Sequence, residues 1–153
     1  MRKRLHKTAN KTEITKDASK EQRSWIMSRI KSIDTAPELL LRRALWAEGL
    51  RYRKYVFNLP GKPDIVFKKS KVAVFVDGRF WHGQKLSEER LQQMSQYWQE
   101  KINRNVARDL NNTQSLISLG YSVLRFTDIF VLKQTSEAVS LIKQALSKAT
   151  ATK

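Results

Sequence analysis

The chain has no cysteine and only two histidines, His6 and His82, among its 153 residues. The absence of cysteine excludes disulfide bonds and any thiolate zinc site, and it fits a reducing compartment. No apolar run approaches the length of a membrane span, and the basic N-terminus lacks the apolar core of a secretory signal. We therefore expect a soluble, cytoplasmic protein that makes no membrane contact and works near the nucleoid.

Acidic residues are scarce relative to basic ones. The chain has 30 Lys and Arg residues against 14 Asp and Glu residues, which gives a net charge of +16. This charge favours a polyanionic partner, most commonly a nucleic acid. Charge alone leaves open a ribosomal or architectural binder and a protein that meets an acidic partner. The hydrophobic content of 41% indicates a globular protein with a real core.

Composition divides the chain into three segments. We expect residues 1–20 to form a basic, flexible N-terminal arm, residues 21–148 a single domain, and residues 149–153 a short basic tail. Apolar spacing predicts helices at about 25–33, 35–49, 94–119 and 137–148, with Trp25 in the core. Runs rich in β-branched and aromatic residues predict strands at 50–57, 65–67, 72–76 and 121–126. This order predicts an α/β fold with a mixed central sheet flanked by helices.

Two of the predicted helices carry sequence signals of their own. Thr35 and Glu38 have the spacing of a capping box, in which each side chain bonds the other's backbone amide. In the long helix at 94–119, residues spaced by four define the expected packing side. They are Trp98, Ile102, Val106 and Leu110.

The most informative segment is a predicted hairpin with an aspartate at each outer end. Asp64 precedes the first strand and Asp77 ends the second, so an antiparallel pairing brings both to one end of the sheet. Either aspartate alone reads as structural, through a turn or an ion pair with Arg79 or another basic residue. Together, in so basic a protein, they suggest a divalent cation held against a phosphodiester, and Mg²⁺ suits a sparse set of carboxylates.

Two further residues are candidates for catalysis. His82 follows the carboxylates closely and is placed to activate a water molecule, although a histidine beside aromatics is also a common core residue. Glu38 belongs to the capping box, and it can also face a metal through water if the helix start abuts the sheet. Sequence position does not separate these alternatives.

Several residues are candidates for DNA contact. Phe80 and Trp81 are either core residues or a wedge that enters a base stack, with Trp25 or Met27 completing a clamp. Arg79 adjoins them. One helical stripe carries Lys101, Arg104 and Arg108, which fits phosphate contact as well as an ordinary solvated face.

Four segments in order resemble the very-short-patch repair (Vsr) DNA mismatch endonucleases, of the restriction-endonuclease-like PD-(D/E)XK superfamily. The resemblance covers about Trp25 to Asp128 and rests on the segments 59–64, 74–83, 97–109 and 119–124. It implies that Asp64 and the backbone carbonyl of Val76 bind Mg²⁺ and that Asp77 borders the metal.

The resemblance also assigns roles to the other candidates. It implies that His82 acts on the attacking water and Glu38 assists, while Phe80 and Trp81 wedge beside a mismatch. The family nicks one strand of double-stranded DNA beside the T of a T:G mispair. Its members usually carry a structural zinc site built from Cys and His, and this chain lacks those residues, so we expect a zinc-less variant.

We therefore predict a Mg²⁺-dependent DNA endonuclease, with a strand-nicking repair function in first place. A restriction, homing, mobile-element or defence nuclease with the same catalytic domain is an alternative, and so is a non-catalytic DNA-binding module. A basic RNA-binding protein is a third class. Repair or mobile-element proteins are further candidate partners, and the sequence leaves the oligomeric state open.

Overall fold

The computed structural model describes residues 19–29, 33–78 and 87–151. Its helices are α1 (Lys20–Arg29), α2 (Ala36–Ala47), α3 (Glu88–Gln92), α4 (Gln96–Ser118), α5 (Asp128–Lys133) and α6 (Thr135–Ala151). The strands are β1 (Ile65–Phe67), β2 (Val72–Asp77) and β3 (Ser122–Thr127). The chain divides into two compact units, Met1–Lys31 and Ser32–Lys153, and α1 belongs to the first. The predicted segment boundaries at residues 20 and 148 stay predictions.

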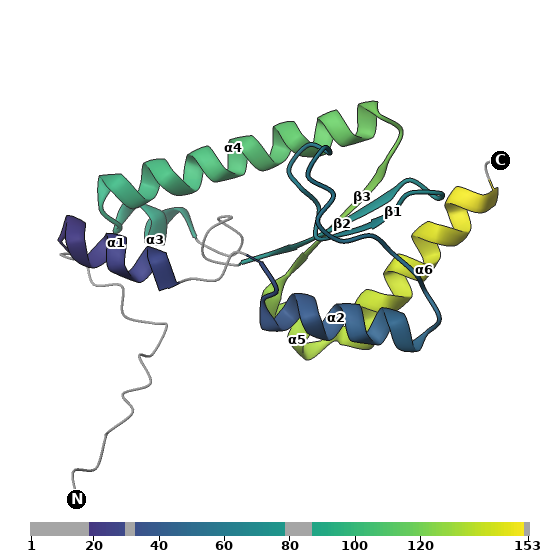
Figure 1. Ribbon diagram of the computed structural model, residues 1–153. Coiled ribbons are helices and arrows are strands. Elements are labelled where there is room, and N and C mark those ends of the chain that lie inside the picture. The colour runs from purple at the N-terminus through teal and green to yellow at the C-terminus, as the bar shows by residue number, and fades with distance from the viewer. Residues whose placement is uncertain (1–18, 30–32, 79–86, 152–153) are drawn as a thin grey trace, which may run out of the picture. The chain divides into compact units, whose positions relative to one another are not determined.

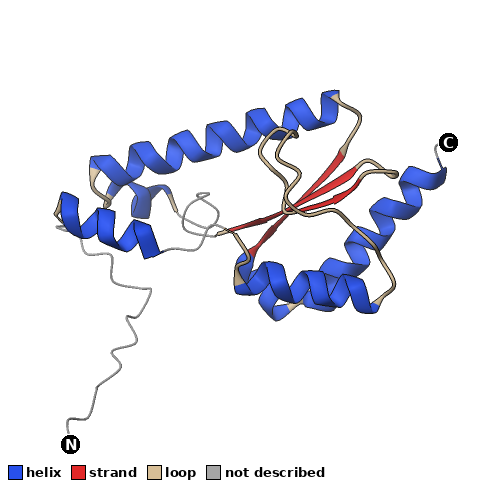
Figure 2. Cartoon of the chain, in the orientation of Figure 1, coloured by secondary structure: helices blue, strands red, loops and turns tan. Residues whose placement is uncertain are grey.

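The three strands form one mixed sheet in the order β1-β2-β3 (Figure 2). Strands β1 and β2 pair antiparallel with Ile65 opposite Val74, which confirms the predicted hairpin. Strands β2 and β3 pair parallel with Val74 opposite Leu124, so the long connection through α4 returns the chain to the same end of the sheet. Asp64, just before β1, and Asp77, at the end of β2, therefore lie at the same end of the sheet.

Helices cover the two faces of this sheet (Figure 1). Because side chains alternate along a strand, Val72 and Val74 face one core and Ala73 and Phe75 face another. The first core contains buried side chains from α2, α5 and α6, namely Leu41, Leu45, Val131, Ala138, Val139 and Ile142. The second core contains Leu116 of α4. Burial on both faces explains the unbroken apolar run of β2. The predicted α/β class is confirmed, and the arrangement is consistent with a restriction-endonuclease-like fold.

Some predicted elements differ from the structure. The segment 50–57 is not a strand: one isolated bridge joins Arg53 to Val66, and Tyr55 has a positive φ of 57°. The predicted helix at 94–119 begins at Gln96, because the separate helix α3 ends just before it. Helix α5 was not predicted, and α6 continues past Lys148 to Ala151.

Two predicted packing residues are exposed. Trp98 and Ile102 are buried in α4 as predicted, but Leu110 is 61% exposed. The expectation that Trp25 is a core residue is also wrong, because Trp25 is 56% exposed on α1 and stacks with the Arg29 guanidinium 4.1 Å from its ring centre. In the described part of the chain, no helix is long and apolar enough to cross a membrane.

Candidate active site

The hairpin holds Asp64 in a fixed position. Its backbone N–H donates to the carbonyl of Val74 (3.0 Å), which extends the ladder one residue beyond β1. Its carboxylate Oδ2 accepts the backbone N–H of Val76 at 2.7 Å. Pro63, immediately before it, is fully buried and has a restricted φ. These contacts fix the carboxylate at the end of the sheet.

The surroundings of Asp64 disfavour its negative charge. Burial is the main cause that raises its pKa from 3.8 to about 7. The negative charges of Glu38 and Asp77 raise the pKa further, whereas the Val76 N–H and the Arg42 guanidinium act in the opposite direction. A carboxylate in such a place is stabilised by a cation beside it, so the surroundings fit a metal ligand.

This raised pKa predicts a pH-dependent cost in the metal-free protein. Between about pH 4 and 7 the unfolded chain loses the Asp64 proton while the folded chain keeps it, so stability falls as pH rises. In EDTA, the free energy of unfolding of Asp64→Asn, taken relative to that of wild type, should therefore be about 2–4 kcal/mol higher at pH 8 than at pH 4. Urea unfolding at both pH values measures this change. A difference that is the same at pH 4 and pH 8 would contradict it.

Asp77 is held by an arginine from the neighbouring strand. Arg125 of β3 donates from Nε to Asp77 Oδ2 (2.8 Å) and from Nη2 to Oδ1 (3.2 Å). The same guanidinium lies 3.3 Å from a carboxylate oxygen of Asp109 and donates to the hydroxyl of Thr113 (3.0 Å). Its central carbon lies 4.2 Å from the ring centre of Phe75. Of the alternatives that the sequence left open for Asp77, an ion pair is thus present, and among the described residues Arg125 is a partner.

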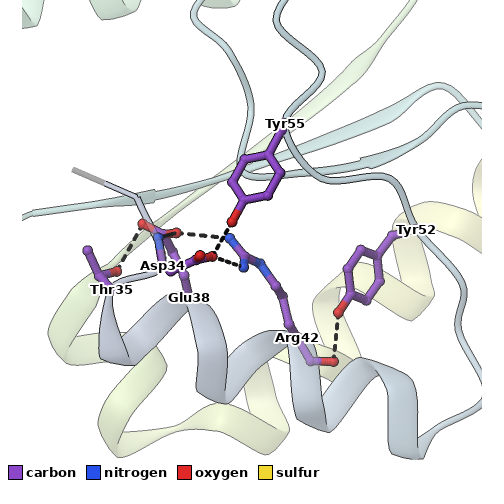
Figure 3. A network of polar contacts seen from close by, with 6 residues as sticks. All are labelled: Asp34, Thr35, Glu38, Arg42, Tyr52 and Tyr55. Carbon is purple, nitrogen blue, oxygen red and sulfur yellow. Dashed lines mark hydrogen bonds and ion pairs between the residues drawn. The ribbon is translucent and has the colours of Figure 1, made fainter. Parts of the chain in front are cut away.

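Glu38 belongs to a polar network at the start of α2 (Figure 3). The predicted capping box is not formed: the Thr35 hydroxyl donates to the Glu38 carboxylate at 2.9 Å instead of accepting its backbone amide. The other Glu38 oxygen accepts the Asp34 backbone N–H and Arg42 Nη2, each at 3.0 Å. Arg42 also pairs with Asp34, which accepts the Tyr55 hydroxyl at 2.5 Å. The network ties the loop around Tyr55 to α2.

Asp64, Asp77 and Glu38 line one cavity of about 650 Å³. The acidic residues around it are Glu38, Asp64, Asp77 and Asp109, and the basic ones are Arg42, Lys62, Arg108 and Arg125. The cavity has room for a phosphodiester beside Asp64, and its basic side chains match the charge of that group. It is therefore the candidate active site.

The DNA-contact candidates lie at different places. Arg108 borders the cavity and donates to the Asn105 side chain at 3.1 Å. Arg104 donates to the Glu100 carbonyl at 3.4 Å, and the Lys101 Nζ lies 5.8 Å from the Tyr97 ring centre. Three DNA-contact candidates, Arg79, Phe80 and Trp81, lie outside the described residues, and so does the catalytic candidate His82. The side chain of Met27 is also outside them, and all these roles stay predictions.

Sequence reasoning missed the arginines and the tyrosine that organise the acidic groups. Arg125 is a lone charge inside an otherwise apolar strand, a pattern that signals a buried counterion. Glu38 and Arg42 have the i, i+4 spacing of a helical ion pair, so the sequence could also have predicted this pair. Tyr55 carries no such signal.

The donor set suits Mg²⁺ better than a cation enclosed by protein. Among the described residues, no group of three or more acidic or histidine side chains is close enough to form a metal centre. Mg²⁺ commonly binds one or two carboxylates and completes its shell with waters and phosphate oxygens. The half-buried Asp64 carboxylate, with the negative charges of Glu38 and Asp77 nearby, fits that requirement.

Comparisons with known proteins identify relatives of this chain. Residues 16–88 match the family model described as "DNA mismatch endonuclease Vsr". The chain is 45% identical over 128 residues to the "Type II nicking enzyme V.NmeDIP" of Neisseria meningitidis serogroup C, covering 82% of this chain and 86% of that protein. It is 40% identical to the "Type II nicking enzyme V.HpaIIP" of Haemophilus parainfluenzae, covering 82% and 92%.

A further relative has the family's own name. The chain is 36% identical over 110 residues to the "DNA mismatch endonuclease Vsr" of Escherichia coli K12, covering 69% of this chain and 68% of that protein. Identities of 36–45% over 69–82% of this chain show its family. The chain therefore belongs to the family of Vsr DNA mismatch endonucleases and is a DNA endonuclease.

Proposed function

We propose that this endonuclease uses Mg²⁺ to nick one strand of double-stranded DNA at a T:G mismatch. The observation that carries the proposal is the half-buried Asp64 carboxylate, fixed by the Val76 N–H in a cavity lined by both acidic and basic side chains. The proposal concerns the metal, the strand choice and the mismatch. Family membership supports the last two, since one relative is named a mismatch endonuclease and others are named nicking enzymes.

Three groups at the end of the hairpin would hold the metal. They are the Asp64 carboxylate, the backbone carbonyl of Val76 and the Asp77 carboxylate, whose charge Arg125 already compensates. When bound, Mg²⁺ polarises the phosphate and stabilises the charge that develops on its oxygens. No zinc is expected to contribute.

The remaining residues act on water and on DNA. We assign His82 as the base that takes a proton from the attacking water, and Glu38 as an assisting acidic group. Arg42 holds the Glu38 carboxylate at 3.0 Å, so this group has a fixed place beside the cavity. Attack of the water oxygen on phosphorus breaks the bond to the 3′ oxygen and leaves a 5′-phosphate and a 3′-hydroxyl.

Basic and aromatic side chains would position the duplex. Arg108 borders the cavity and is placed to contact phosphates. Lys101 and Arg104, nearer the N-terminus of α4, would extend this contact. Phe80 and Trp81, with Arg79, would lie against the mismatch and wedge into the stack. The net charge of +16 supports binding to DNA, and we expect the enzyme to act on the nucleoid in the cytoplasm.

Cleavage of matched and mismatched duplexes tests this proposal. End-labelled duplexes that differ only in a T:G mispair, a T:A pair or a methylated C:G pair are incubated with the protein in Mg²⁺ or in EDTA. We expect a nick in the T strand of the T:G duplex alone, and only with Mg²⁺. Equal cutting of the matched duplexes would favour the restriction or defence alternative, and no metal-dependent cutting would refute the enzyme assignment.

A further inference from the structure

A pair of stacked aromatic rings lies at the rim of the active-site cavity. The rings of Tyr55 and Phe57 have centroids 6.1 Å apart and an interplanar angle of 14°. Both side chains line the cavity that contains Asp64, and Phe57 is 59% exposed. We call these two residues the aromatic platform. A single exposed aromatic side chain is ordinary, so the surroundings of the platform decide its meaning.

Side-chain contacts with the network at the start of α2 hold the Tyr55 ring of the platform in place. The Tyr55 hydroxyl donates to Asp34 at 2.5 Å, and the Arg42 guanidinium carbon lies 5.6 Å from the Tyr55 ring centre. Tyr55 and Lys62 have positive φ angles of 57° and 52°, which non-glycine residues adopt at a cost. Such backbone persists only where the surrounding contacts determine it, as at binding sites. The platform is therefore preformed.

The platform also has positive charge beside each ring. The Nζ of Lys54 lies 4.9 Å from the Tyr55 ring centre, and the Nζ of Lys62 lies 5.8 Å from the Phe57 ring centre. A purely apolar protein partner offers nothing to these ammonium groups. A nucleotide offers both a flat base for the ring and phosphates for the lysines.

We propose that Phe57 stacks against a base of the DNA substrate, displaced from its own stack near the scissile phosphate, while Lys54 and Lys62 contact the adjoining phosphates. The assignment rests on the proposed function only in taking DNA as the substrate. It is separate from the wedge proposed for Phe80 and Trp81, because the platform comes from the loop before β1. The flexible stem of Lys62 lets its ammonium move from the ring to a phosphate when the base arrives.

Binding measurements on non-cleaving protein test this inference. In an Asp64→Asn background, Phe57→Leu keeps an apolar side chain but removes the aromatic face, and Phe57→Trp keeps that face. With a fluorescein-labelled T:G duplex, we expect Phe57→Leu to weaken binding about tenfold and Phe57→Trp to stay within about twofold of the parent. Trp46→Leu is the matched control, because Trp46 is 56% exposed beside the Arg51 guanidinium but is not among the described residues that line the cavity. Its affinity should not change.

A second measurement reports the stacking itself. The fluorescent base 2-aminopurine is placed in turn at each position within about three nucleotides of the nick. We expect one position to show quenching that Phe57→Leu removes and Trp46→Leu retains. Unchanged affinity in Phe57→Leu, equal losses in Phe57→Leu and Trp46→Leu, or no position with Phe57-dependent quenching would overturn the inference. Failure of wild type to nick any duplex would refute the proposed function, while these binding results would still decide the role of Phe57.

Discussion

Asp64→Asn is expected to lower the nicking rate at saturating Mg²⁺ by at least about a thousandfold. A metal that stabilises developing charge contributes several kcal/mol to the transition state, and each 1.4 kcal/mol corresponds to a tenfold change in rate. The substitution replaces the half-buried carboxylate that we propose as a metal ligand by a neutral amide. The amide oxygen can still accept the Val76 N–H, so the hairpin should keep its geometry.

The measurement is single-turnover nicking of the T:G duplex, with DNA binding followed on the same protein. Binding should change little, because the basic residues that we propose to contact phosphates are untouched. Glu48→Gln is the matched acidic control: Glu48 is exposed and pairs with Lys143 at 2.8 Å on the outside of α2 and α6. Its nicking rate should equal that of wild type. A nicking rate for Asp64→Asn within tenfold of wild type would remove Asp64 from the reaction.

The hairpin could be predicted because its determinants are local. Two short apolar runs separated by a polar turn specify an antiparallel pair, and the pair sets both aspartates at one end of the sheet. Because β3 pairs parallel with β2, Arg125 of β3 lies near the same end of the sheet, where it contacts Asp109 and Thr113 of α4. The acidic centre therefore follows from sequence pattern and strand topology.

Apart from the local pair of Glu38 and Arg42, the partners of the acidic groups could not be predicted in the same way. Arg125 lies 48 positions from Asp77, and Tyr55 lies 21 positions from Asp34, so no local spacing links either pair. The segment 50–57 looked like a strand because it contains Tyr52, Tyr55 and Val56, yet one bridge is all the pairing that it makes with β1. Its side chains are used for the network with α2 and for the platform, and these tertiary contacts outweigh strand propensity.

Exposed residues on α4 illustrate the same limit. The spacing of Trp98, Ile102, Val106 and Leu110 is that of one helical face, but only the first two are buried. Leu116, further along, fills the second core against Ala73 and Phe75. A helix of this length extends beyond the sheet, so its periodicity says which face is apolar and leaves open how far along that face the core extends.

Arg125→Met should destabilise the protein by about 3 kcal/mol. The substitution leaves the carboxylates of Asp77 and Asp109, 6% and 16% exposed, without the guanidinium that lies between them. Removal of one partner from a buried ion pair typically costs about 3–5 kcal/mol, and the 20% exposure of the Arg125 side chain places this case at the lower end. Urea unfolding at pH 7.5 in EDTA measures the loss. Arg108→Met, at an exposed arginine of the same cavity, should stay within about 0.5 kcal/mol of wild type.

A double-mutant cycle then separates charge compensation from packing. If Arg125 acts mainly by neutralising Asp77, Asp77→Asn should recover at least about 1 kcal/mol when it is added to Arg125→Met, since it removes the uncompensated charge. If Arg125 matters through its contact with the Phe75 ring, 4.2 Å from the guanidinium carbon, the two substitutions should simply add. Additive losses would therefore contradict the ion-pair assignment.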